Sequence, residues 1–159
     1  MIQTLTKAVI QRYLFIKDGI LMKANRVLRS ASQLSSAEYI ADRVKIAYQS
    51  LGSDDIPELE SLYTEDVHFE DPARALQGRR SLMDHFASLF ENLESCSFKF
   101  HQVLINETDI SMSWTMFVAH PKLRNGATIR VEGCSLFRTR HGRIYYHRDY
   151  YDLGEMVYE

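Results

Sequence analysis

Residues 96–119 read CSFKFHQVLI, NETD and ISMSWTMFVA, two long runs joined by four polar residues. In the second run an apolar side chain recurs at every second position: Ile110, Met112, Trp114, Met116 and Val118. A period of two is typical of a β-strand with one buried face, and the polar tetrapeptide is favourable turn chemistry. The stretch therefore predicts a β-hairpin with Trp114 in the core.

Two further strand-like segments follow this hairpin, residues 127–138 and 143–151. Asn125-Gly126 precedes the first segment and His141-Gly142 separates the two, and both dipeptides favour tight turns. Strands that are joined by short connections pair antiparallel. Residues 96–151 therefore predict a four-stranded antiparallel meander.

The residues before the meander favour three helices and one short strand. A capping box at residues 35–38 starts the first helix, a second helix begins near residues 54–55 and buries Tyr63, and a third follows Gly78. Residues 67–71 alternate as a short strand. The sequence predicts an α+β domain over residues 35–159, in which the helices lie against one face of a curved, mainly antiparallel sheet.

The first 34 residues differ in charge from the rest of the chain. They hold six basic residues and one acidic residue, a net charge of +5, whereas residues 35–159 carry −7. We interpret residues 1–34 as a basic N-terminal extension, in which residues 1–21 are either an over-called start before Met22 or a loosely attached helix. A third hypothesis is that residues 1–34 bind an acidic partner or a membrane surface.

Composition excludes several classes of protein. The net charge of −2 disfavours a nucleic-acid partner, and no apolar run approaches the ~18 residues of a transmembrane helix. Cys96 and Cys134 lie in strand-like stretches and lack metal-ligand spacing, which favours two reduced core thiols in a cytoplasmic protein and no metal. Glycine-rich nucleotide-binding motifs are missing, so we expect no cofactor.

Asp149 is an acidic residue in the middle of a strand-like segment. Tyr145, His147 and Tyr151 share its predicted face. A carboxylate among aromatic rings is poorly solvated, so we expect its pKa to rise into the range of a useful acid or base. The alternative is that Asp149 pairs with an arginine of a neighbouring strand.

Asp71 also ends a strand face, and it has a second interpretation as the cap of the turn before Pro72. His147 and Asp149 could begin a metal site with His101 as a third ligand, although a hydrogen-bonded structural histidine is the better interpretation.

A set of motifs resembles the SnoaL-like branch of the nuclear-transport-factor-2-like superfamily over about residues 36–156. The motifs are YTEDVHFEDP at residues 63–72, Gly78-Arg79, Trp114, Val131-Glu132-Gly133, Gly142-Arg143-Ile144 and HRDYYD at residues 147–152. Membership implies a cone-shaped fold, in which a strongly curved sheet wraps around the long helices and encloses an apolar cavity. It also implies homodimers through the outer face of the sheet.

The resemblance implies different activities in different relatives. Limonene-epoxide hydrolases have an acid–base aspartate at the position of Asp149 and a water-positioning asparagine at Asp71, but also an arginine and an aspartate on the earlier strand. That strand reads SMSWTMF at residues 111–117, so epoxide hydrolysis is disfavoured. In ketosteroid isomerases Asp71 would be the base, but the oxyanion tyrosine falls near Ala47 rather than Tyr48 and the second donor falls at Ser135. Polyketide cyclases need chiefly one acid–base aspartate and fit best.

We therefore expect a protein that binds a small apolar or aromatic ligand, and acts as a cofactor-independent isomerase, cyclase or dehydratase. Asp149 and Asp71 are the predicted catalytic residues, and the predicted substrate-binding residues are Tyr48, Phe69, Trp114, Ser135, His147 and Tyr151. The alternative is a non-catalytic ligand-binding or dimerisation module. An open cavity that contains both carboxyl groups would favour chemistry, and one plugged by Trp114, Phe69 and Tyr151 would favour the module.

Overall fold

The computed structural model describes residues 36–49, 51–52, 55–91 and 93–157. The chain divides into two units, Met1–Leu34 and Ser35–Glu159, and only the second contains described residues. The expectations for the basic extension therefore lie outside the described residues.

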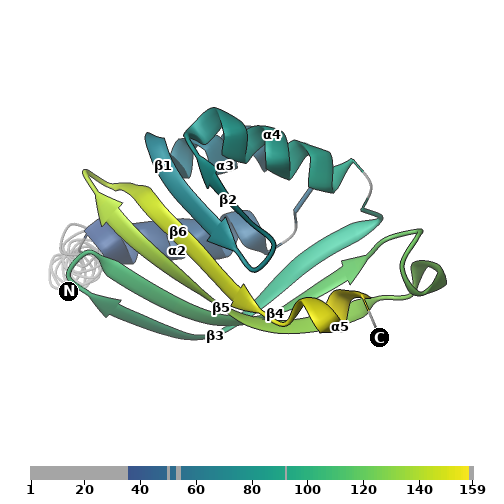
Figure 1. Cartoon of the computed structure of the whole chain (residues 1–159). Coiled ribbons are helices and arrows are strands. Elements are labelled where there is room, and N and C mark those ends of the chain that lie inside the picture. Colours follow the sequence, from purple (N-terminus) through teal and green to yellow (C-terminus); the bar gives the residue numbers. More distant parts are fainter. Residues whose placement is uncertain (1–35, 50, 53–54, 92, 158–159) are drawn as a thin grey trace, which may run out of the picture. The chain divides into compact units, whose positions relative to one another are not determined.

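The described residues form a six-stranded curved sheet (Figure 1). Its strands are β1 (Tyr63–Asp71), β2 (Arg74–Gln77), β3 (Ser95–Asn106), β4 (Asp109–Ala119), β5 (Ile129–Arg140) and β6 (Arg143–Tyr151). The strand order is β2-β1-β6-β5-β4-β3. The predicted meander from β3 to β6 is confirmed, since its neighbouring strands pair antiparallel in chain order.

The sheet has two features that the sequence analysis did not predict. Tyr63 begins β1 instead of ending a helix, and β2 folds back on β1 as a short hairpin. β1 then pairs in parallel with β6, at the opposite end of the domain sequence, and this pairing places Phe69 beside His147. The aromatic C-terminal segment thus becomes a central strand.

Four helices are present in the described part of the chain: α2 (Ser36–Tyr48), α3 (Ile56–Leu62), α4 (Arg79–Phe90) and α5 (Leu153–Val157). The first three match the predicted helices, and the short α5 is additional. In each of α2, α3 and α4, apolar side chains at helical spacing are buried in a common core with the inner face of the sheet. The α+β fold class is therefore confirmed.

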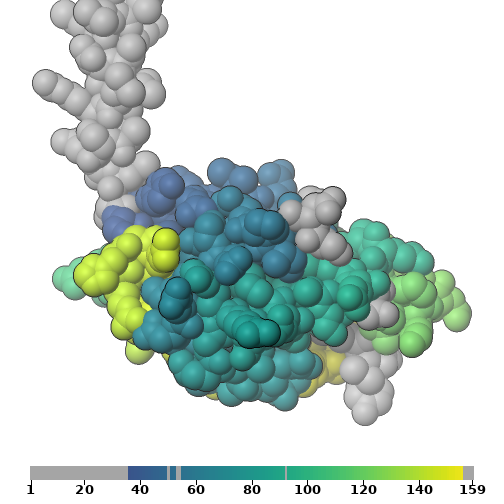
Figure 2. Space-filling view, turned by 90° about the horizontal axis from the view of Figure 1, so that it is seen from above, coloured from purple at the N-terminus to yellow at the C-terminus, as the bar shows by residue number. Residues whose placement is uncertain are grey.

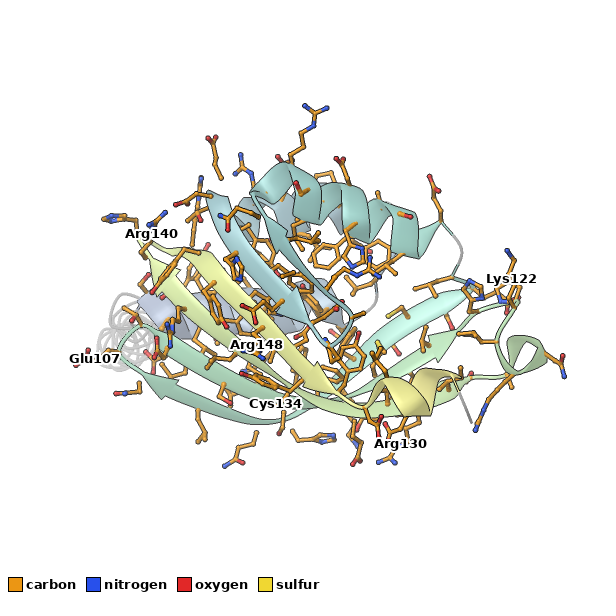
Figure 3. The ribbon with its side chains drawn as sticks, in the orientation of Figure 1. Glu107, Lys122, Arg130, Cys134, Arg140 and Arg148 are labelled. Atoms are coloured by element: carbon orange, nitrogen blue, oxygen red, sulfur yellow. The ribbon has the colours of Figure 1, made fainter. Side chains whose placement is uncertain are left out.

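Helices α2, α3 and α4 and the β1–β2 hairpin cover the concave face that β3 to β6 form (Figure 1). Seen from above, they hide most of it, while the β4–β5 connection and the β5–β6 turn emerge at its two ends (Figure 2). Arg130 and Cys134 lie on the opposite, convex face (Figure 3). None of the described helices combines the length and the apolar character needed to cross a membrane.

One predicted strand face is wrong in part. A register shift near the start of β6 separates the pair Arg138 and Tyr146 from the pair Thr139 and Ile144. Because a bulge inserts one extra residue, it reverses the alternation on its far side. Ile144 is consequently fully buried in the core, and Tyr145 instead stacks against the guanidinium of Arg140.

Candidate functional site

A cavity of about 250 Å³ lies inside the domain, between the inner face of the sheet and α4. Both predicted catalytic carboxylates, Asp71 and Asp149, line it. Aromatic side chains form much of the remaining wall: Phe69, Phe86, Phe90, Phe98 and Trp114. The space is therefore apolar for the most part, with a few polar groups.

Six of the eight predicted site residues line this cavity: Tyr48, Phe69, Asp71, Trp114, Asp149 and Tyr151. The other two, Ser135 and His147, lie behind the wall and hydrogen-bond Asp149. The structure thus brings all eight residues to the cavity or to its immediate support. Phe69, Trp114 and Tyr151 belong to the wall and leave the space open.

Asp149 is held by two donors on one of its oxygens. Ser135 Oγ lies 2.5 Å from Oδ1, and His147 Nε2 lies 2.9 Å from the same atom. Ser135 is directly opposite Asp149 in the β5–β6 register, and His147 is two residues away on β6, so the sheet fixes both distances. The side chain of Asp149 is 19% exposed, and that of His147 only 1%. Among the residues that the structure describes, the partners of Asp149 are Ser135 and His147 and not the arginine of the alternative interpretation.

The hydrogen bonds continue away from Asp149 in two branches. In one branch Trp114 Nε1 donates to Ser135 Oγ over 2.8 Å. In the other, His147 Nδ1 lies 3.0 Å from the hydroxyl of Tyr63, which lies 2.9 Å from that of Tyr48. Five side chains thus support one carboxylate.

The direction of these bonds follows from their chemistry. A carboxylate oxygen only accepts, so His147 Nε2 donates the hydrogen bond to Asp149, and in a ring with one N–H the Nδ1 atom accepts a hydrogen bond from the Tyr63 hydroxyl. Tyr63 in turn accepts from Tyr48. Burial raises the pKa of Tyr63, and burial together with Tyr63 and Asp149 raises the pKa of Tyr48. Both hydroxyls therefore remain protonated donors at neutral pH.

Tyr151 also stays protonated beside the two carboxylates. Burial, with smaller contributions from Asp71 and Asp149, raises its pKa to about 12. Its hydroxyl is a neutral donor in the cavity wall, close enough to both carboxylates to be affected by their charges.

Asp71 both lines the cavity and caps a turn. Its Oδ1 accepts from the backbone N–H groups of Ala73 at 2.7 Å and Arg74 at 2.8 Å, and its Oδ2 lies 3.7 Å from Arg74 Nε. The predicted capping role before Pro72 is therefore confirmed. The same contacts fix the carboxylate at the cavity wall.

Two polar residues of the cavity were missed by the sequence analysis, Arg74 and His85. Arg74 NH1 lies 3.0 Å from His85 Nδ1. Their contact depends on β2, which was not predicted. This strand brings the turn that Asp71 caps against α4. The sequence did contain one indication for His85, because this residue falls on the apolar stripe of α4 next to Phe86.

The metal alternative finds no support in the geometry. His101 hydrogen-bonds Thr115 Oγ1 at 2.8 Å. No group of three or more His, Cys, Asp or Glu side chains capable of holding a metal ion occurs within the ranges that the structure describes.

The two cysteines should differ sharply in reactivity. Cys96 lines the cavity, and burial raises its pKa to about 12, so only about one part in 10⁴ is thiolate at pH 8. The prediction of a core thiol is wrong for Cys134, which lies half-buried on the convex face. We expect a thiol reagent at pH 8 to label one cysteine rapidly in the native protein, and Cys134→Ser to remove that fast phase. Rapid labelling of the Cys134→Ser variant would contradict this burial of Cys96.

The curved sheet, the helices on its concave face and the aspartate on its last strand define an α+β protein of the nuclear-transport-factor-2-like fold. Residues 44–147, more than half of the chain, match the family model described as "SnoaL-like domain". The chain therefore belongs to the SnoaL-like domain family. No curated protein sequence matches it.

Solved structures with this fold share little sequence with the chain. A putative SnoaL-like polyketide cyclase from Jannaschia sp. CCS1 is 14% identical with a TM-score of 0.66, covering 80% of this chain and 97% of that one. A putative polyketide cyclase from Xanthomonas campestris pv. campestris is 18% identical with a TM-score of 0.64, covering 78% and 98%. An LEH-like epoxide hydrolase from M. tuberculosis is 18% identical with a TM-score of 0.63, covering 76% and 86%. At these identities the likeness shows the fold alone.

Proposed function

We propose that this protein binds a small, largely apolar molecule in the cavity and that Asp149 transfers a proton on that molecule without a cofactor. The reaction class is isomerisation, cyclisation or dehydration. The observation that carries the proposal is the arrangement of Asp149, a carboxylate in an otherwise apolar wall with its two donors on the same oxygen.

This arrangement suits a general base. Ser135 and His147 both bond to Oδ1, and within the described residues no donor reaches Oδ2. Oδ2 can therefore take up a proton while both supporting hydrogen bonds stay in place. Since a general base has to reach the proton that it removes, a carboxylate exposed to the cavity and fixed from behind meets the geometric requirement.

Asp71 is the second carboxylate of the proposal, with a more limited role. Its Oδ1 is occupied by two backbone donors and its Oδ2 is near Arg74, so its charge is already compensated. We assign to it the orientation of the ligand rather than the main proton transfer. Epoxide hydrolysis stays disfavoured, because β4 presents Trp114, Met116 and Val118 to the cavity and no arginine–aspartate pair.

The size of the cavity limits the ligand. About 250 Å³ lies just below the usual volume range of sites for drug-sized ligands, which favours a compound of one or two small rings with short substituents. We expect no larger polycyclic molecule to enter without a rearrangement of the wall. Homodimerisation through the convex face and a cytoplasmic location stay predictions.

The proposal is tested by proton exchange on small carbon acids. The protein is incubated in D₂O with 1-indanone and phenylnitromethane, and deuterium incorporation next to the activating group is followed by NMR. We expect deuterium to be incorporated into at least one probe faster than in buffer alone. This acceleration should vanish when a competing ligand occupies the cavity. Binding of both probes without any acceleration would contradict the catalytic role and favour the alternative of a non-catalytic binding module.

A further inference from the structure

Arg74 and His85 form a polar pair in the cavity wall that does not belong to the Asp149 network. Arg74 lies on β2, His85 lies on α4, and their side chains meet with Arg74 NH1 3.0 Å from His85 Nδ1. A guanidinium group has only donors, so Nδ1 must accept. His85 is therefore neutral, and its proton sits on Nε2.

The surroundings of His85 favour this neutral form independently. Burial and the positive charge of Arg74 lower the pKa of His85, and Asp71 opposes them to a smaller extent. At neutral pH the ring is then an uncharged donor through its Nε2–H.

The partly buried ring of His85 has two aromatic neighbours. It packs against Phe69 with 6.1 Å between ring centroids, and against Phe86 with 6.0 Å. In the part of the chain that the structure describes, no acceptor lies within hydrogen-bond distance of Nε2. An N–H donor in an aromatic cavity wall is a place where a ligand oxygen gains a hydrogen bond.

The charges around the cavity indicate whether the ligand oxygen that His85 binds is charged or neutral. Asp71 and Asp149 bring two negative charges and Arg74 brings one positive charge, which Asp71 already approaches at 3.7 Å. A carboxylate or phosphate ligand would meet a wall of net negative charge. An uncharged acceptor, such as a carbonyl or ether oxygen, meets no such repulsion.

We propose that the Nε2–H of His85, with the ring tautomer fixed by Arg74, binds an uncharged oxygen of the ligand. The ligand class is therefore a small, neutral, oxygen-bearing ring compound, and His85 is the residue that selects for the oxygen. This inference rests on the proposed function, because it takes the same cavity as the ligand site.

The test compares two probes of nearly equal shape, acetophenone and ethylbenzene, with benzoate as the anionic probe. Affinities are measured by NMR titration of the full-length protein labelled with ¹⁵N-histidine. We expect acetophenone to bind about 2- to 10-fold more tightly than ethylbenzene, which corresponds to one neutral hydrogen bond, and benzoate to bind more weakly than acetophenone. Acetophenone should also shift the Nε2 resonance of His85, and ethylbenzene should shift it far less.

Variants separate the hydrogen bond from simple packing. His85→Phe should bring the ratio of the two affinities to about one, whereas His85→Gln, which keeps an N–H donor, should retain part of the preference. His68→Phe, at a histidine that pairs with Glu70 outside the cavity, is the matched control and should leave the ratio unchanged. Arg74→Met should make the Nδ1–H tautomer of His85 detectable in the ¹⁵N spectrum.

Four results overturn the inference. An unchanged preference in His85→Phe would show that another group binds the oxygen, and tighter binding of benzoate than of acetophenone would show that the ligand class is anionic. Asp149→Asn should keep the preference, since it removes proton transfer and not the His85 donor. If the wild-type protein binds the probes but does not prefer acetophenone to ethylbenzene, this inference alone is overturned. If none of the three probes binds, the inference is overturned together with the proposed ligand site.

Discussion

Asp149→Asn should reduce the catalysed deuterium exchange by about 10²- to 10⁴-fold, the usual contribution of a general acid or base. The asparagine cannot take up a proton at neutral pH. Its amide oxygen can still accept from Ser135 and His147, at the place where Oδ1 accepts now. The fold should therefore survive, and we expect the melting temperature to stay within a few degrees of the wild type.

The matched control for this variant is Asp109→Asn, the same substitution at a residue with a half-exposed side chain whose partner is Arg138. It should leave both exchange rate and melting temperature nearly unchanged. A large loss of stability in Asp149→Asn with unaltered exchange would instead assign Asp149 a structural role. Exchange rates, probe affinities and thermal unfolding curves of the three proteins decide between these outcomes.

Gly133→Ala should destabilise the protein by about 2–3 kcal/mol, as overpacking of a core does. Gly133 lies opposite Trp114 in the β4–β5 register, and an added Cβ would fall within 2.7 Å of three atoms of its indole ring. The φ angle of Gly133 is not positive, so the cost comes from this collision rather than from backbone strain. For a domain of this size we expect the melting temperature to fall by roughly 5–10 °C.

A double variant tests the cause of that loss. Trp114→Phe removes the outer ring that the Cβ would meet, so Gly133→Ala should cost clearly less in the Trp114→Phe background than in the wild type. Gly52→Ala is the control, since the nearest atom to its added Cβ lies 3.8 Å away. If Gly133→Ala lowers the stability equally in the wild type and in Trp114→Phe, a collision with the Trp114 ring is not the cause. The Trp114 ring also supports Ser135, so Gly133→Ala should slow proton exchange as well.

Much of the candidate site could be predicted from local sequence. His147 and Asp149 are two residues apart on one strand, so their shared face follows from the pleat and does not depend on the rest of the fold. Trp114 could be placed in the core for the same reason. Asp71 stood out at the end of a strand face, and the family resemblance then directed attention to Tyr48 and Ser135.

Other residues of the site could not be predicted in this way. Tyr63 joins the Asp149 network only because β1 pairs in parallel with β6, and the long stretch of sequence between Tyr63 and His147 contains no local sign of that pairing. The same holds for Arg74 and His85, which meet through the β1–β2 hairpin. Tyr145 was misplaced because a bulge near the start of β6 reverses the side-chain alternation.

The sequence by itself determined the strand period, the turns, the helices and hence the α+β class, because these depend on residues that are close neighbours in the chain. Only the tertiary structure decided which strand lies beside β6, how Asp149 is supported and which polar groups share its cavity. Strand partners and bulges are selected by the burial of the whole sheet and by contacts between distant segments, and such contacts leave little trace in local pattern. The aspartate could thus be found by reading the chain, whereas the Tyr48–Tyr63–His147 support and the Arg74–His85 pair required the fold.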